Sequence, residues 1–113
     1  MTKIQSFNKD PFKAFERFLN WSHLVESYED EGEYFTIVSN NSSAKMLQKE
    51  FVEYLADPNK VRVSKGYDES AGAELVTISP TKDRWRKVIL TFEDMPQYYE
   101  YGGDIAVSIE DVF

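Results

Sequence analysis

The sequence contains no cysteine, which excludes a disulfide framework and a thiolate metal site. It has no apolar run of the roughly eighteen residues that a membrane-spanning helix needs, so we expect no membrane association. Its first residues, Met1 to Ser6, lack the apolar segment of a signal peptide. These absences predict a cytoplasmic protein.

Residues that carry catalysis are also scarce. The only histidine, His23, is more typical of a surface or partly buried position than of an active site. No phosphate-binding glycine loop, dinucleotide fingerprint or histidine pair is present. Glu50 and Glu53, one helical turn apart, could form an acid–base pair, but the sequence places no metal ligand beside them. We predict a protein without enzymatic activity, cofactor or metal.

Basic residues are outnumbered by acidic ones, and the formal net charge is −7. This charge argues against binding to nucleic acid, which requires a basic footprint. It favours a basic protein partner, because opposite fields accelerate encounter. Solubility alone is the alternative explanation, since many small domains are this acidic.

The charges are unevenly distributed along the chain. One acidic run contains Glu26, Glu29, Asp30, Glu31 and Glu33. From Val88 to the C-terminus there are six carboxylates and no lysine or arginine. Between the two regions, a basic island surrounds Asp83; it consists of Lys82, Arg84, Arg86 and Lys87.

The length of 113 residues predicts a single domain spanning residues 1–113, and an aromatic content of 15% indicates a folded core. Asp10-Pro11 is a typical helix start, and the apolar spacing predicts a first helix that ends near Tyr28. A second helix is expected from Ala44 to Asp57, where Pro58 stops it.

Five segments are typical of β-strands. They are Tyr34–Ser39, Val61–Tyr67, Leu75–Ser79, Trp85–Phe92 and the alternating Ile105–Ile109. A tyrosine-rich excursion, Met95 to Tyr101, precedes the last of them and ends at Gly102-Gly103. The predicted fold is α+β, a five-stranded antiparallel sheet with two helices in the order α-β-α-β-β-β-β.

The predicted second helix carries two stripes of side chains. Leu47, Phe51, Tyr54 and Leu55 recur at helical spacing and would face the sheet. Met46, Glu50, Glu53 and Asp57 form a neighbouring row. Such stripes are most often simply a core face and its solvated flank.

The central stretch resembles the bacteriophage uracil-DNA glycosylase inhibitor family. The likeness rests on Gly66-Tyr67-Asp68-Glu69-Ser70, on Leu75 to Ser79, and on the pairs Met46-Leu47, Glu50-Phe51 and Glu53-Tyr54-Leu55 in the second helix. Trp85 to Asp94 and Gly103 to Ile109 are similar to the family's last strands. The resemblance covers most of the chain and is weak over residues 1–33.

The resemblance implies an inhibitor that mimics DNA and forms a 1:1 complex with uracil-DNA glycosylase, monomeric when free and active in the host cytoplasm. Such an inhibitor lays an acidic edge strand and helix in the basic cleft of the enzyme. It captures the side chain that the enzyme wedges into DNA during base flipping in an apolar cavity.

Carried over residue by residue, the resemblance assigns two groups of partner-binding residues. The acidic and polar group is Ser39, Asn40, Asn41, Ser42, Ser43, Glu50, Glu53, Asp83 and Asp104. The apolar cavity would be lined by Met46, Phe51, Tyr54, Leu55, Val63, Val76 and Ile78.

The chain also departs from the family pattern. The family has a carboxylate between its first strand and second helix, where this chain offers Asn40 or Ser42. Phe51 and Tyr54 are bulkier than the expected aliphatic residues, and the basic island would have to face away from a basic cleft.

Two other classes of function remain open. One is a different acidic decoy, such as an antirestriction protein, an anti-CRISPR protein or an immunity protein against a nuclease toxin. The other is a small enzyme or ligand-binding domain.

Overall fold

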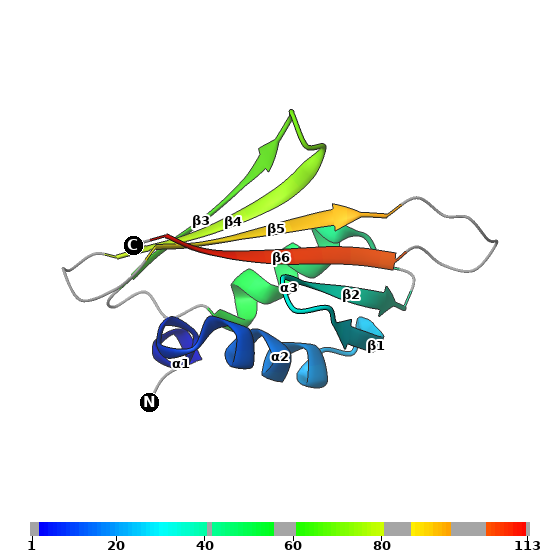
Figure 1. The fold of residues 1–113 in the computed structure, drawn as a ribbon, viewed down its shortest axis with the longest axis horizontal. Coiled ribbons are helices and arrows are strands. Elements are labelled where there is room, and N and C mark those ends of the chain that lie inside the picture. Colours follow the sequence, from blue (N-terminus) through cyan, green and yellow to red (C-terminus); the bar gives the residue numbers. More distant parts are fainter. Residues whose placement is uncertain (1–2, 41, 56–60, 81–86, 96–103, 113) are drawn as a thin grey trace.

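The computed structural model describes residues 3–40, 42–55, 61–80, 87–95 and 104–112. Three helices and six strands follow one another along the chain in the order α-α-β-β-α-β-β-β-β (Figure 1). The helices are α1 (Lys3–Lys9), α2 (Pro11–Trp21) and α3 (Ala44–Leu55). The strands are β1 (Val25–Asp30), β2 (Tyr34–Ser39), β3 (Val61–Asp68), β4 (Ala73–Pro80), β5 (Lys87–Asp94) and β6 (Asp104–Val112).

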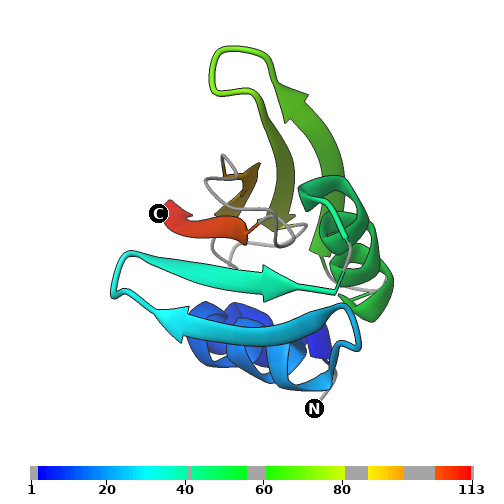
Figure 2. The same cartoon turned by 90° about the vertical axis from the view of Figure 1, so that its right-hand side faces the viewer.

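All six strands form one antiparallel sheet in the order β1-β2-β6-β5-β4-β3. The sheet is strongly twisted, so the β3–β4 hairpin stands steeply away from β1 and β2 (Figure 2). Helix α3 contacts β3, β4 and β5, and α2 lies beside β1. In the part of the chain that the structure describes, no helix lies on the opposite face of the sheet, which we call the open face.

The prediction of an antiparallel α+β fold is confirmed, but the predicted element order is wrong in two places. The first is the end of α2, which stops at Trp21 and not near Tyr28. Ser22 ends it: its backbone N–H donates to the Phe18 carbonyl at 2.8 Å, and its hydroxyl accepts from the Leu24 N–H at 3.2 Å. Residues 25–30 then form a sixth strand, β1.

Physical chemistry explains why β1 forms where a helix was expected. A helix extended to Tyr28 would place Glu26 in its last turn, with Glu29 and Asp30 just beyond, where carboxylates oppose the macrodipole. As a strand, the same segment directs Tyr28 onto Phe35 of β2, with ring centroids 6.2 Å apart, and leaves the carboxylates in water.

The second difference is α1, a helix that the sequence reading left unassigned. It packs through Phe7, which is fully buried against Phe51 of α3 with ring centroids 5.4 Å apart. The predicted start of α2 is confirmed: the Asp10 carboxylate accepts from the Lys13 N–H at 3.2 Å, and Pro11 opens the helix.

The five predicted strands all occur, with small shifts of their bounds: Tyr34–Ser39 is β2, and the others lie in β3, β4, β5 and β6. The expected excursion from residue 96 to Gly103 lies outside the described residues. So do residues 56–57 at the end of the predicted second helix and residues 85–86 at the start of a predicted strand.

An aromatic cluster forms the centre of the core between the helices and the sheet. Phe15 and Phe18 of α2 meet Phe51 of α3 at centroid distances of 5.2 and 5.0 Å, and Phe92 of β5 closes the cluster. Each such pair contributes about 0.5–1.5 kcal/mol beyond its burial.

No helix in the described ranges is long and apolar enough to cross a membrane.

Candidate functional site

The polar cluster between β2 and α3 makes internal hydrogen bonds. Ser39 donates to the Ser42 carbonyl at 2.8 Å, and the Asn40 amide donates to the His23 carbonyl at 3.1 Å. Ser42 donates to the Leu24 carbonyl at 3.4 Å. Ser43 accepts from the Met46 N–H at 3.3 Å, as a helix cap does. These side chains tie the β2–α3 connection to the turn after α2; Asn41 lies outside the described residues.

The two carboxylates predicted on α3 differ in exposure. Glu50 accepts a hydrogen bond from the Ser22 hydroxyl, and its side chain is only 14% exposed. His23, which is itself exposed, lies 3.9 Å from the other carboxylate oxygen of Glu50. Glu53 is exposed. Glu50 therefore links α3 to the end of α2 through a hydrogen bond. Of the two carboxylates, only Glu53 is exposed to solvent.

The apolar residues expected around one cavity occupy two different environments. Four of them, Phe51, Leu55, Val76 and Ile78, are buried in the core. Met46 is 49% exposed, and Tyr54 and Val63 are partly buried at the margin of the core. The Tyr54 ring is tilted by 46° against that of Trp21, with centroids 5.0 Å apart, and the Lys3 ammonium lies 4.2 Å from the Tyr54 ring centroid. The seven side chains are therefore divided between the core, its margin and the exposed side of α3.

The Gly66–Ser70 segment that resembles the inhibitor family ends β3 and turns into β4. Asp68 accepts from the Ser70 hydroxyl at 2.7 Å and from the Ser70 N–H at 3.0 Å, the pattern of an Asx turn. The hydrogen bond from the Ser70 side chain is the main cause of the lowered pKa of Asp68. These contacts give the motif a local structural role.

Two further predicted residues lie apart from this region. Asp104 begins β6 beside Val38 of β2 and is half-buried. Its carbonyl accepts from the Met95 N–H at 2.8 Å. Asp83 and most of the basic island lie outside the described residues, and Lys87, at the start of β5, is exposed.

The acidic run, which was not assigned to the site, forms the edge of the sheet. Strand β1 is the edge strand and pairs with β2 in the sheet that the structure describes, and Glu26, Glu29 and Asp30 are exposed along it. Glu31 and Glu33 continue the run through the β1–β2 turn. In the described ranges, none of these five carboxylates forms an ion pair with lysine or arginine. The signal in the sequence was the run of five carboxylates with no lysine or arginine among them.

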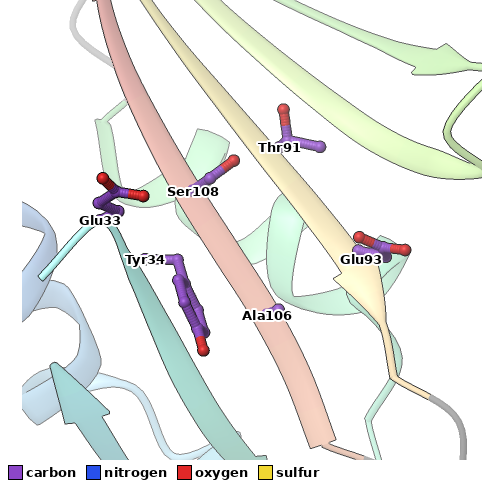
Figure 3. Close-up of a pocket in the computed structure, with 6 residues that line it drawn as sticks. All are labelled: Glu33, Tyr34, Thr91, Glu93, Ala106 and Ser108. Atoms are coloured by element: carbon purple, nitrogen blue, oxygen red, sulfur yellow. The ribbon is translucent and has the colours of Figure 1, made fainter. Parts of the chain in front are cut away.

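A hollow of about 260 Å³ lies next to this edge, on the open face of the sheet. Its lining comes from three strands and the β1–β2 turn (Figure 3). The residues are Glu33, Tyr34, Thr91, Glu93, Ala106 and Ser108. The hollow thus adds Glu93 to the five carboxylates of β1 and the β1–β2 turn.

Neither a protein-family model nor a curated protein nor a solved structure matches this chain. Within the described residues, no group of three or more histidine, aspartate or glutamate side chains is arranged to hold a metal ion.

Proposed function

We propose that this protein inhibits a DNA-acting enzyme by occupying its basic DNA-binding cleft with the acidic edge formed by β1 and the β1–β2 turn. The single observation that carries the proposal is the uncompensated acidic edge. Between Arg17 and Lys45 the sequence has five carboxylates and no lysine or arginine, and the fold gathers these five on an exposed strand and its turn.

The arrangement of these charges suits a phosphate-binding surface. Glu29 and Asp30 are consecutive in β1, and Glu31 follows in the turn. Because successive side chains of a strand point to opposite faces, this edge presents carboxylates on both of its sides. A cleft whose lysines and arginines track phosphates could contact such an edge without a base pair being present.

Uracil-DNA glycosylase is the enzyme to which the resemblance of the central stretch points. Helix α3 enters this proposal differently from the family pattern. Phe51, Leu55, Val76 and Ile78 are buried in the core, so the binding energy would come from charge and from the strand edge. Glu53 and the exposed Met46 are on α3, which contacts β3, β4 and β5, so any contact they make with the enzyme would be separate from the edge. The complex would be 1:1 and would form in the cytoplasm.

The packing of those four residues also supports a second candidate, an acidic decoy for another nucleic-acid enzyme. An apolar cavity for a wedge residue is the feature specific to glycosylase inhibition, whereas an acidic edge fits any basic cleft. A nuclease toxin or a restriction endonuclease would bind the same surface by the same electrostatic complementarity.

The test is uracil excision from a labelled oligonucleotide, with bacterial and human-type glycosylases and the protein in slight excess. We expect loss of excision, and recovery with Glu29→Lys because it reverses a charge on the edge. A tenfold weaker inhibition corresponds to about 1.4 kcal/mol. Glu69→Lys, an equal charge change on the exposed β3–β4 turn, is the matched control and should inhibit like the native protein.

The same two variants are assayed in parallel against a basic nuclease that cleaves DNA without sequence preference. Inhibition of the nuclease alone would identify the second candidate. Full activity of every enzyme, or equal inhibition by the Glu29→Lys and Glu69→Lys variants, would overturn the acidic edge as the binding surface.

A further inference from the structure

The hollow on the open face owes its shape to a change in side-chain size across three strands. The central strand, β6, contributes Ala106 and Ser108, which are small. Tyr34 of β2 lies directly opposite Ser108, and Glu93 of β5 lies directly opposite Ala106. Neighbouring strands are about 4.8 Å apart, so the larger side chains stand as walls on either side of a low floor (Figure 3).

The walls combine three kinds of group. The Tyr34 side chain is 41% exposed and presents an aromatic ring to the solvent. Glu33 and Glu93, both exposed, come from opposite sides of the hollow, and Thr91 and Ser108 supply hydroxyls. In the described ranges neither Glu33 nor Glu93 forms an ion pair with a lysine or arginine.

We propose that this hollow binds a single arginine side chain of the protein partner. A guanidinium is planar, stacks on aromatic rings and offers five N–H donors, which suits a site with a ring, two carboxylates and two hydroxyls. A lysine ammonium is a compact point charge without a planar face, so it matches the ring and the two carboxylates of this site less well than a guanidinium does. The inference rests on the proposed function only in that the partner is basic.

The size of the hollow agrees with one side chain as the occupant. Sites for drug-sized ligands and cofactors measure about 300–1,000 Å³, whereas this one is smaller, about 260 Å³. Its position beside the β1–β2 turn means that a partner seated on the acidic edge could place a neighbouring arginine in it. The hollow would then fix the register of a contact that the edge attracts by charge alone.

The test uses a short glycine peptide carrying two arginines and its lysine counterpart, titrated into the isotopically labelled full chain and followed by amide NMR. We expect the arginine peptide to shift the amides of Tyr34, Thr91 and Ser108 and to bind more tightly than the lysine peptide. Glu93→Gln and Ala106→Leu should weaken arginine binding about fivefold, the scale of one exposed charge or cation–π contact.

Glu110→Gln is the matched control, because Glu110 is an exposed carboxylate of β6 that does not line the hollow. Equal binding of the two peptides, shifts confined to β1, or equal effects of Glu93→Gln and Glu110→Gln would each overturn the arginine site. The acidic edge has a separate readout, since Glu29→Lys is scored in the inhibition assay. Failure of the hollow and failure of the proposed function are therefore distinguishable.

Discussion

Helix α3 and strand β1 both carry glutamates at short intervals, but the fold uses them in opposite ways. Glu50 of α3 is mostly buried, is hydrogen-bonded to Ser22 and lies near His23. Glu26 and Glu29 of β1 are exposed, and neither is paired with a cation in the described ranges. A carboxylate beside a core face can connect two elements of the fold by a hydrogen bond, whereas a carboxylate on a sheet edge stays available to a partner.

The two elements differ because of their neighbours. Helix α3 has α1 on one side and β3, β4 and β5 beneath it, so its apolar stripe is covered and its flank meets the end of α2. Strand β1 pairs with one strand, β2, in the described sheet, and the register irregularity between Val25 and Ser27 interrupts the pairing at Glu26. A charged, irregular edge disfavours pairing with a second sheet while remaining open to a basic surface.

The largest effect is expected where α3 meets the core. Phe51→Ala removes a fully buried ring from the centre of the aromatic cluster, which should lower the free energy of unfolding by roughly 3–5 kcal/mol. Urea denaturation followed by circular dichroism measures this loss. Met46→Ala, on the exposed side of the same helix, should change the stability by less than about 0.5 kcal/mol. A large loss from Met46→Ala instead would show that the outer side of α3 is part of the core.

A smaller effect should separate the two kinds of carboxylate directly. Ser22→Ala leaves the Glu50 carboxylate without its hydroxyl donor, and we expect a loss of about 1.5–3 kcal/mol, the range for a hydrogen bond to a charged group. Glu29→Gln, which removes a charge from the open edge, should leave the urea midpoint nearly unchanged. Similar losses of stability from both variants would contradict the distinction between the hydrogen-bonded carboxylate of Glu50 and the exposed carboxylates of β1.

Much of the fold followed from local patterns in the sequence. Asp10-Pro11 predicted the start of α2, and the alternation in Ile105–Ile109 predicted β6, because capping and side-chain periodicity are decided by nearby residues. The end of α2 was missed because apolar residues up to Val25 continue a helical spacing. Only the pairing with β2, a tertiary contact, selects the strand.

The site was harder to predict than the fold. The Ser39–Ser43 cluster has the composition of a binding corner, yet its partners, the carbonyls of His23 and Leu24, come from a turn about seventeen residues earlier. Spacing on a helix likewise could not distinguish Glu50 from Glu53, because the difference depends on Ser22. The hollow on the open face depends on strand register, which brings Tyr34, Ser108 and Thr91 side by side.

The smallest effect concerns Asp68, which is exposed to solvent like the β1 carboxylates but has internal partners like Glu50. The Ser70 hydroxyl lowers its pKa below the ordinary value of 3.8, so the charged form is favoured in the folded protein. The resulting contribution to stability is present at neutral pH and is lost as the pH falls through the lowered pKa.

NMR titration of the Asp68 carboxyl should show a midpoint below 3.8, and Ser70→Ala should raise it. Ser64→Ala, earlier in the same strand as Asp68, should leave that midpoint unchanged; an equal rise in both variants would mean that Ser70 is not the cause. Because the Asp68 carboxyl is exposed, Ser70→Ala should lower the urea midpoint at neutral pH less than Ser22→Ala does. That order would show that a hydrogen bond to a buried carboxylate contributes more to stability than a hydrogen bond to an exposed one.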